Sequence, residues 1–560
     1  MPSPGAELAY VWGDMAVDLP AGPAGAAGRA GPGGTGTGDD PGGGPGKAPG
    51  YVPPASGGGP GAPGGPPAPG PSVPGPPAPP SANAADSAPR AVLSRALSVP
   101  LILGLVFGLP AVVSAQYGDG VRDEAYWLQL VLTCYAGARL SAMVLTARRR
   151  LIQGSFWLFC YIAMGVAPLA QAVLGRTPTP VVGPRSDTVL AIALVLLGCV
   201  AFDVGVLLAR HRPALRIRWS PPAASVGRRR LYLLILLAYA GSGLFIVQLG
   251  GPAVFFESRQ EISESIGASG AGGGDGNVGS AFLRGFGTVP ALLALLFLLR
   301  WLVTSKVPRR SPVILLLLAG LVAVNAVVNN PVSNPRYWFL TVAFAILFTA
   351  FPKSPVMYRT SLALGVIAAL LLFPFMDRFR YDEEGRKAVE SSSFVEPLTL
   401  KDYDQIGMFA NTITFVDSGA GHSYGRQLAG TTFFFVPRSL WDGKPLDSGV
   451  RVGQWMGMTN TNLSSPLWAE LWLDFGSGGM VAGFLGLGYL CARGDRRYAL
   501  RTVDDERPGN ITAAVIPLIA GYSFILLRGP LLQAAGRIGI ALFCLALVTT
   551  FRSDVRKLLR

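Results

Sequence analysis

The chain has 560 residues, of which 50% are hydrophobic and 14% are charged, and its mean hydropathy is +0.41. Such values are typical of a polytopic membrane protein and exclude an ordinary soluble enzyme. The net charge of +14 does not indicate a nucleic-acid-binding protein, because the basic residues lie in short clusters between apolar runs.

Residues 1 to about 90 are dominated by Gly, Pro, Ala and Ser. A stretch of this composition buries too little apolar surface to offset the conformational entropy that folding removes. It is therefore predicted to be a disordered cytoplasmic tail. Residues 91–560 are predicted to form one polytopic membrane domain.

From residue 97 onward, twelve apolar stretches are long enough to cross about 30 Å of hydrocarbon as helices, at about 1.5 Å per residue. They cover residues 97–116, 125–146, 154–174, 186–209, 230–250, 281–303, 311–329, 336–351, 357–376, 466–490, 511–528 and 531–551. The chain is thus predicted to be an all-α membrane protein with about 12 transmembrane helices.

The basic clusters agree with this number of crossings. If the tail lies in the cytoplasm, every even-numbered connection returns there, and so does the C-terminus. The clusters on that side are Arg148–Arg150, Arg210–Arg230, Lys306–Arg310, Lys353 with Arg359, Arg493–Arg507 and Arg552–Arg560. Cytoplasmic connections carry such an excess of Lys and Arg, so twelve crossings explain the pattern and eleven do not. Both termini are expected in the cytoplasm.

Two connections on the predicted outer side are long, at about 251–280 and 377–465. The first is rich in Gly. The second contains Phe433–Phe435, Trp441 and Trp455, and aromatic residues are depleted in disordered segments. Long loops within a domain are usually functional or disordered. The second connection is therefore expected to carry the functional site.

Cations on the outer side are informative because they oppose the usual charge bias. They are Arg259, Arg284, Arg336, Arg378, Arg380, Arg426, Arg438, Lys444, Arg451 and Arg528. The planar fork of Arg suits phosphate oxygens, and several forks beneath one loop would hold a lipid-linked pyrophosphate. The alternative is that these side chains reach lipid headgroups. The predicted catalytic arginines are Arg438 and Arg336, and the predicted substrate ligands are Arg284, Lys444, Arg528, Arg259 and Arg380.

Carboxylates near the same face are the next candidates. Glu470 opens the tenth apolar stretch, where it is a candidate general base or a salt-bridge partner for one of the arginines. Asp402 and Asp404 have the spacing of a metal-binding acidic pair, although two acids at that spacing arise easily by chance. Arg139 and Asp203 lie inside predicted helices, where a structural ion pair is the preferred interpretation.

Metal and cofactor chemistry find little support in the composition. The chain has two histidines, His211 and His422, and its five cysteines show no paired spacing. No metal site and no cofactor are predicted.

With these residues in view, the chain resembles the Wzy-type O-antigen polymerases, the bacterial oligosaccharide repeat-unit polymerases, over about residues 95–550. The resemblance lies in the twelve-helix plan, the two enlarged outer loops and the order of short patterns. Those patterns are Asn334-Pro335-Arg336-Tyr337, Tyr424-Gly425, Val436-Pro437-Arg438 with Lys444-Pro445, Asn462-x-Ser464 before Glu470 and Asp474-Phe475-Gly476, and Arg528-Gly529. Some members have an Arg followed by a Gly eleven residues later, as do Arg259 with Gly270 and Arg438 with Gly449 here.

The resemblance implies a glycosyltransferase-C-like membrane enzyme that is metal-independent and inverting. It would join polyprenyl-pyrophosphate-linked oligosaccharides on the outer face of a bacterial cytoplasmic membrane, with a flippase and a chain-length regulator as possible partner proteins. Related O-antigen ligases use a histidine in the large loop, and His422 keeps that reading open as a substrate-site residue. A lipid-oligosaccharide flippase is a third reading. The chain disfavours it, because no repeat symmetry relates its halves and its charges gather at one face.

Overall fold

The structure is a computed structural model of the chain. It describes residues 99–146, 148–211, 223–256, 276–372, 395–399, 403–459, 461, 463–504 and 509–552. All of these residues belong to one compact unit, Pro89–Arg560. The predicted tail, residues 1–90, lies outside the described residues.

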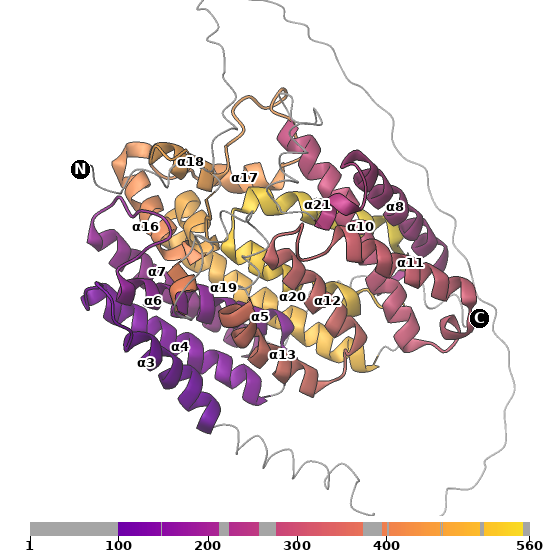
Figure 1. Cartoon of the computed structure of the whole chain (residues 1–560), viewed down its shortest axis with the longest axis horizontal. Coiled ribbons are helices and arrows are strands. Elements are labelled where there is room, and N and C mark those ends of the chain that lie inside the picture. The colour runs from indigo at the N-terminus through magenta and orange to yellow at the C-terminus, as the bar shows by residue number, and fades with distance from the viewer. Residues whose placement is uncertain are drawn as a thin grey trace, which may run out of the picture. The chain divides into compact units, whose positions relative to one another are not determined.

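Helices make up nearly all of the described part of the chain (Figure 1). Those that coincide with the predicted apolar stretches are η1 (Leu103–Gly108), α3 (Leu109–Ser114), α4 (Glu124–Thr146), α5 (Leu151–Phe159), η2 (Cys160–Val166), α6 (Ala167–Leu174), α7 (Arg185–His211), α8 (Arg228–Gln248), α10 (Gly276–Thr304), α11 (Pro312–Val328), α12 (Arg336–Ala350), α13 (Pro355–Ile367), η5 (Ala368–Leu372), α19 (Leu467–Asp504), α20 (Thr512–Arg528) and α21 (Leu531–Val548). The predicted helix positions therefore match the described helices.

Seven of these helical stretches are long and apolar enough to cross a membrane: α4, α5–α6, α7, α8, α10, α19 and α21. Shorter apolar helices of 10–17 residues lie at the other five predicted positions. The chain is an all-α, membrane-embedded protein, and crossing by the five shorter helices stays a prediction. Helix α19 continues beyond the tenth predicted apolar stretch, to Asp504.

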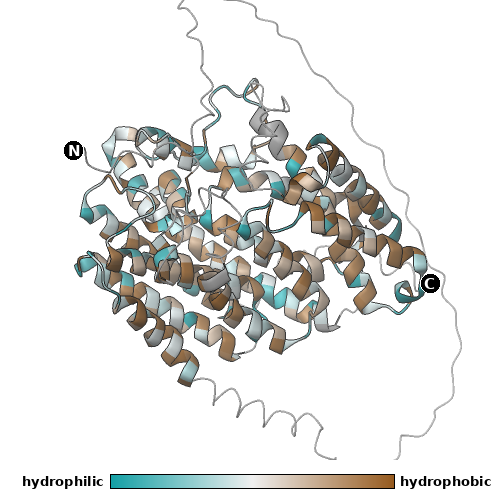
Figure 2. Ribbon diagram, viewed as in Figure 1, coloured by the Kyte–Doolittle hydropathy of each residue, from teal (hydrophilic) through white to brown (hydrophobic). Residues whose placement is uncertain are grey.

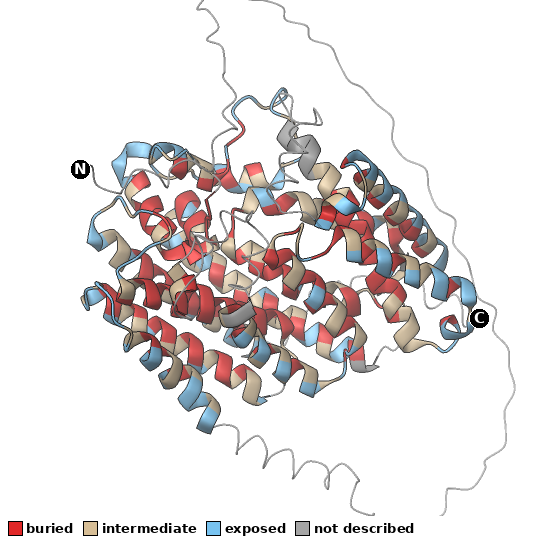
Figure 3. Ribbon diagram, in the orientation of Figure 1, coloured by how far each residue is buried: buried red, intermediate tan, exposed pale blue. Residues whose placement is uncertain are grey.

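Large apolar side chains remain exposed along these helices. Leu236, Leu316 and Leu542 are 65%, 74% and 61% exposed. Figure 2 shows apolar residues along most of the helices, and Figure 3 shows exposed residues on the helices at the margin. A soluble monomer rarely exposes so much apolar surface, whereas lipid tails accommodate it.

Connections that were predicted to share the cytoplasm lie together in the structure. Strand β1 (Ala223–Val226) pairs antiparallel with β2 (Thr549–Arg552), and Asn510 bridges to Ser225. Arg149 and Pro352 lie in two other connections that were predicted to be cytoplasmic. The guanidinium of Arg149 donates to the carbonyl of Pro352. This grouping agrees with the predicted topology, and the side of the membrane that these ends face stays a prediction.

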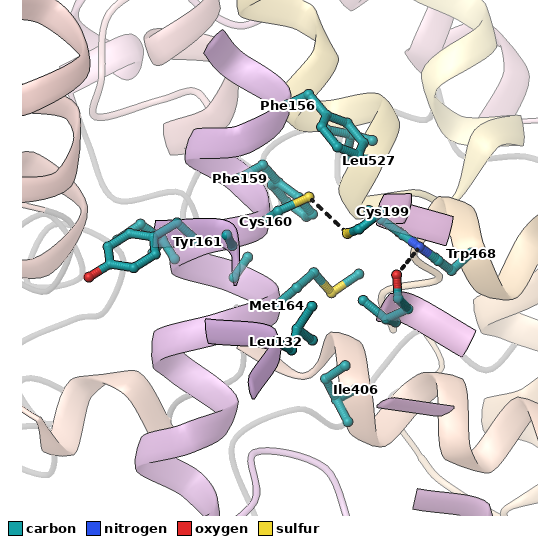
Figure 4. Close-up of a cluster of buried hydrophobic side chains, with 14 of the residues drawn as sticks. Leu132, Phe156, Phe159, Cys160, Tyr161, Met164, Cys199, Ile406, Trp468 and Leu527 are labelled. Atoms are coloured by element: carbon teal, nitrogen blue, oxygen red, sulfur yellow. Dashed lines mark hydrogen bonds between the residues drawn. The ribbon is translucent and has the colours of Figure 1, made fainter. Parts of the chain in front are cut away.

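The helices pack around two hydrophobic cores. The first core lies among α4, α5, η2, α7 and α19, and Figure 4 shows part of it around Phe156, Cys160 and Trp468. Phe156 stacks on Phe202 with ring centroids 3.7 Å apart. The second core lies among α8, α10, α11 and α21. Helix α12 joins the two, because Tyr337 packs in the first core and Trp338 in the second.

The large predicted outer loop contains several packed helices. The segment 395–465 includes η6 (Glu396–Thr399), α16 (Gln405–Phe415), η8 (Val416–Ala420), α17 (Arg426–Thr432) and α18 (Ser448–Trp455). Helix α16 is part of the first core, where Phe409 and Ile413 are fully buried. The side chain of Asn411 completes the packing by accepting from Val182 N at 3.0 Å and donating to Pro180 O at 2.8 Å. The segment is therefore an integral part of the fold.

Candidate functional site

The 395–465 segment contacts the N-terminal ends of α12, α19 and α21 and the C-terminal end of α20, and we call these four ends the loop end. Trp468 anchors the start of α19, since its indole N–H donates to Val195 O at 3.2 Å inside the first core (Figure 4). At Gly476 the backbone takes φ 65° and ψ −166°, a conformation that L side chains rarely adopt. Trp468 and this break together fix the position of the residues between them.

Glu470 lies in that fixed stretch and is only 4% exposed. Its carboxylate accepts a hydrogen bond from the Ser448 hydroxyl and one from the Leu531 backbone N–H at 3.3 Å. Ser448 and Leu531 are the first residues of α18 and α21, and a carboxylate is favourable at a helix N-terminus. Glu470 therefore holds two helices together through its hydrogen bonds, and neither of its hydrogen-bond donors is an arginine.

Asp474, one turn further along α19, positions a third helix. It accepts from Gln427 N at 3.0 Å and Leu428 N at 2.8 Å, in the first turn of α17. Capping of this kind satisfies N–H groups that have no partner within their own helix. The acidic residues of the α19 start thus organise the helices around the loop end.

Arg438 and Lys444, which were predicted to bind the substrate, brace their own segment. Arg438 donates to Lys444 O at 2.8 Å and to Pro445 O at 3.2 Å. The buried ammonium of Lys444 donates to Phe434 O at 2.7 Å and to Val436 O at 2.8 Å. The N–H groups of Arg438 and Lys444 that would donate to phosphate oxygens thus donate to backbone carbonyls in the structure. Direct phosphate binding by these two residues stays a prediction.

Arg336 and Arg528 are brought together at the loop end. The Arg336 guanidinium lies 5.8 Å from the centre of the Tyr403 ring, and that of Arg528 lies 5.6 Å from the centre of the Tyr337 ring. Aromatic faces attract cations and hold the planar guanidinium in a defined orientation. Two of the predicted arginines, from α12 and α20, thus meet beside the start of α16.

A carboxylate completes this group. Asp404 precedes α16 and accepts from the Ser464 hydroxyl at 2.5 Å. Burial raises the pKa of Asp404, while the nearby Arg528 opposes that rise. Asp402, the other member of the predicted acidic pair, lies outside the described residues.

Two further arginines, Arg284 and Arg537, lie on the packed helices α10 and α21. Arg284 was predicted from its position, whereas Arg537 was missed because the sequence reasoning weighed cations at the ends of helices. The Arg537 guanidinium lies 4.3 Å from the centre of the Trp338 ring. Its position in the interior of an apolar stretch is the feature of the sequence that could have identified Arg537 as a candidate.

The second core provides no carboxylate for these cations. None of the helices α8, α10, α11, α12, α20 and α21 contains an Asp or Glu. The buried polar groups there are mainly amides, such as Asn329, which accepts from Trp338 Nε1 at 2.8 Å and donates to Asn325 Oδ1 at 2.8 Å. The arginines of this half therefore lack counter-ions from their own helices.

His422 lies on the other side of α19. Its ring centre is 5.0 Å from that of Trp472, and its buried Nδ1 has no hydrogen-bond partner in the structure. Arg259 and Arg380, the remaining predicted ligands, lie outside the described residues. Within the described part of the chain, no three His, Cys, Asp or Glu residues are grouped so that they could hold a metal ion.

A cavity of about 490 Å³ lies away from the loop end. It is formed at the C-terminal ends of α10 and α12, and its lining includes Arg300, Thr304, Lys353 and Ser354. These residues lie at the opposite ends of the same helices that carry Arg284 and Arg336. The cavity is therefore separate from the candidate site.

Comparisons of this chain with family models, with curated proteins and with solved structures give no match in any of the three. The chemistry must therefore be inferred from the residues that the fold brings together. At the loop end these are the Arg336–Arg528 pair with Asp404, and Arg537 with Trp338.

Proposed function

We propose that the chain is a membrane polymerase that joins polyprenyl-pyrophosphate-linked oligosaccharides, the function that its resemblance to Wzy-type polymerases implies. The observation that carries the proposal is the meeting of Arg336 and Arg528 at the loop end. Two guanidinium groups at the ends of membrane helices suit a phosphate-bearing lipid whose tail remains in the bilayer.

In the proposed reaction, a hydroxyl of the acceptor sugar attacks the anomeric carbon of the donor sugar. The bond between that carbon and the pyrophosphate oxygen breaks, and the pyrophosphate leaves with the electron pair on its lipid. Arg336 and Arg528 would stabilise the negative charge that develops on the leaving oxygen. Attack from the opposite face inverts the configuration at the anomeric carbon.

A base must accept the proton of the attacking hydroxyl. We assign this role to Asp404, because it lies near Arg528 and burial raises its pKa toward the range useful for a general base. Glu470 was the expected base, but neither of its hydrogen-bond donors is an arginine, whereas Asp404 lies near Arg528. In this proposal Glu470 positions α18 and α21.

The test is polymerisation by the purified protein in nanodiscs, with a polyprenyl-pyrophosphate oligosaccharide as the substrate and product bands counted on a gel. Arg336→Ala, Arg528→Ala and Asp404→Asn should each reduce the number of joined units. Arg229→Ala is the control, since Arg229 is exposed at the start of α8. Polymerisation by Arg336→Ala at the parental rate would refute this site.

The ligase reading is favoured by one observation, the unpartnered Nδ1 of His422. A ligase would transfer a finished glycan to a different acceptor lipid, and that transfer would depend on His422. Deletion strains separate the readings further. Acceptors that carry single repeat units indicate a lost polymerase, free unattached polymer indicates a lost ligase, and lipid-linked units trapped inside indicate a lost flippase.

A further inference from the structure

Residues 433–445, which we call the tip, pack against the interior of two membrane helices through Phe434. The Phe434 ring stacks on Phe282 of α10 with ring centroids 6.1 Å apart. On the other side, a Cβ added at Gly539 of α21 would lie 2.4 Å from the Phe434 ring. Gly539 is eight positions beyond Leu531, where α21 begins, which corresponds to roughly 12 Å along the helix axis. The tip therefore reaches alongside α21, a helix long and apolar enough to cross a membrane.

A row of phenylalanine rings continues from this contact. Phe435 lies edge-on to Phe434 with ring centroids 5.7 Å apart. Phe282 stacks on Phe286 at 6.4 Å, and Phe286 contacts Phe543 of α21 at 6.2 Å. Both ends of the row are open, since Phe435 is 58% exposed and Phe543 is 53% exposed. The row thus connects the tip to the apolar surface of the membrane helices.

The tip presents further apolar side chains outward. Phe433 is 49% exposed and Leu440 is 80% exposed. Helix α17, which leads into the tip, packs on α21 (Figure 1). On α21 itself Leu542 is exposed, as expected of a helix that lipid tails surround. Apolar side chains next to such a surface are favourable in lipid and unfavourable in water.

The cations of the tip satisfy its backbone carbonyls. The ammonium of Lys444 donates to Phe434 O at 2.7 Å and to Val436 O at 2.8 Å. Arg438 donates to Lys444 O at 2.8 Å and to Pro445 O at 3.2 Å. Water supplies donors to the carbonyls of an ordinary exposed loop, whereas lipid supplies none. The two cations therefore replace water as donors to these carbonyls.

Backbone N–H groups of the tip are paired within it as well. Val436 N donates to Phe433 O at 3.0 Å, and Leu440 N donates to Pro437 O at 3.1 Å. Irregular backbone is tolerated at the depth of a membrane only where the protein satisfies its polar groups. The tight turns and the two cations together meet this requirement for the groups that they pair.

We propose that the tip inserts into the bilayer leaflet at the loop end, where Phe433, Phe435 and Leu440 contact lipid acyl chains. The exposed Arg438 then lies at the level of the phosphate headgroups, which its long side chain can reach. The partner of this surface is the bilayer itself. The inference goes beyond the proposed function, because it does not depend on which reaction the protein catalyses.

Site-directed spin labelling measures the depth of the tip in liposomes of phosphatidylethanolamine and phosphatidylglycerol. A nitroxide is attached to Phe435→Cys or Leu440→Cys of the full chain, and its relaxation by oxygen, which concentrates in lipid, is compared with relaxation by a water-soluble nickel chelate. Oxygen should dominate at both positions, as it should at Leu542→Cys on α21. The chelate should dominate at Asp417→Cys, because Asp417 is an exposed acid of the 395–465 segment.

The parental protein treated with the same label gives the background from its five cysteines. Relaxation by the chelate at Phe435→Cys and Leu440→Cys as strong as at Asp417→Cys would place the tip in water and overturn the proposal. Protection of both labels from oxygen and chelate alike would also overturn it, because the tip would then be covered by protein, such as a second copy of this chain.

Thermal unfolding in the same liposomes tests the backbone interactions without a label. Lys444→Met keeps a side chain of similar length but removes the donor to two carbonyls, so it should lower the Tm. Lys306→Met is the control, since Lys306 is exposed, and it should keep the parental Tm. A parental Tm for Lys444→Met would show that water reaches these carbonyls, and the insertion of the tip into lipid would be wrong.

Discussion

At the first core, the carboxylates Asp203 and Asp495 have partners within the protein. Asp203 accepts from Arg139 and from Tyr135, both at 2.5 Å, and Asp495 accepts from Ile152 N at 2.9 Å and Gln153 N at 3.1 Å. In the second core, Arg284 and Arg537 lie on the packed helices α10 and α21, and none of the helices of this core contains a carboxylate. Paired charges hold helices in register, whereas unpaired like charges leave a site for a ligand. We therefore assign a structural role to Asp203 and Asp495, and we assign binding to the arginines of the loop end.

The binding role of the loop-end arginines requires that the loop end faces outward. Reporter fusions test that orientation with an all-or-none result. Fusions at Arg310 and Arg497 should report the cytoplasm, because both lie in basic clusters. A fusion at Ser439, within the 395–465 segment, should report the outside. A cytoplasmic signal at Ser439 would remove the basis for a site that uses externally presented lipid-linked sugars.

The next largest effect is expected from the arginines of the loop end. Arg336→Ala and Arg528→Ala should each lower turnover by roughly ten- to a hundredfold, since one charge-assisted hydrogen bond is worth about 1.5–3 kcal/mol. Arg→Lys should be partly tolerated. Arg438→Ala should also lower turnover, because the segment loses two hydrogen bonds. The rate of polymer formation in nanodiscs, with Arg229→Ala as the control, measures these effects.

Stability should separate the two cores directly. Asp203→Asn leaves Arg139 without a charged partner and should lower the free energy of unfolding by about 2–4 kcal/mol, since the half-buried pair lies between the apolar helices α4 and α7. Arg537→Gln in the second core should lower it less, because Arg537 has a ring contact and, within the described residues, no ion pair. Chemical unfolding in detergent measures both.

An exposed ion pair provides the matched control for Asp203→Asn. Asp123 and Arg185 are 2.7 Å apart, with side chains 30% and 55% exposed, and breaking them should change stability by less than about 1 kcal/mol. Equal losses in Asp123→Asn and Asp203→Asn would show that the buried pair has no special role in the first core.

A smaller, pH-dependent effect is expected at Asp447, the N-cap of α18, which lies close to Glu470. Burial raises its pKa to about 6, so the folded state disfavours the ionised form. Between pH 4 and 6, roughly, the folded state keeps a proton that the unfolded state releases, and stability falls by about 2–3 kcal/mol as pH rises through that window.

Asp447→Asn should remove this loss while keeping a side chain that caps the helix. The variant should therefore be more stable than the parent at pH 8 and about equally stable near pH 4. Melting curves at several pH values measure the difference. If the difference between variant and parent does not change with pH, the assignment of this titration to Asp447 is wrong.

The smallest effect is expected from the tail. Deleting residues 2–85 should leave membrane insertion and polymerisation nearly unchanged, because a stretch of that composition adds nothing to either core. Activity and expression of the truncated protein are compared with the parent. A loss of activity at normal expression would give the tail a role in recruitment or regulation.

The sequence alone located the helices of this protein. A helix in a membrane needs a local run of apolar residues, so its position can be read without its neighbours. The same local reasoning paired Arg139 with Asp203, because two opposite charges inside apolar helices have few other partners, and the structure confirms this pair at 2.5 Å.

Only the tertiary structure decided which polar groups meet at the loop end. The sequence does not indicate any partner for Arg438 and Lys444. In the structure both side chains donate to backbone carbonyls of their own segment, because the folded segment brings those carbonyls to them. Glu470 becomes a link between α18 and α21 only when distant residues reach it. Arg537 lies over the ring of Trp338, which belongs to a distant part of the sequence. Such partners depend on long-range packing, which no local pattern of residues specifies.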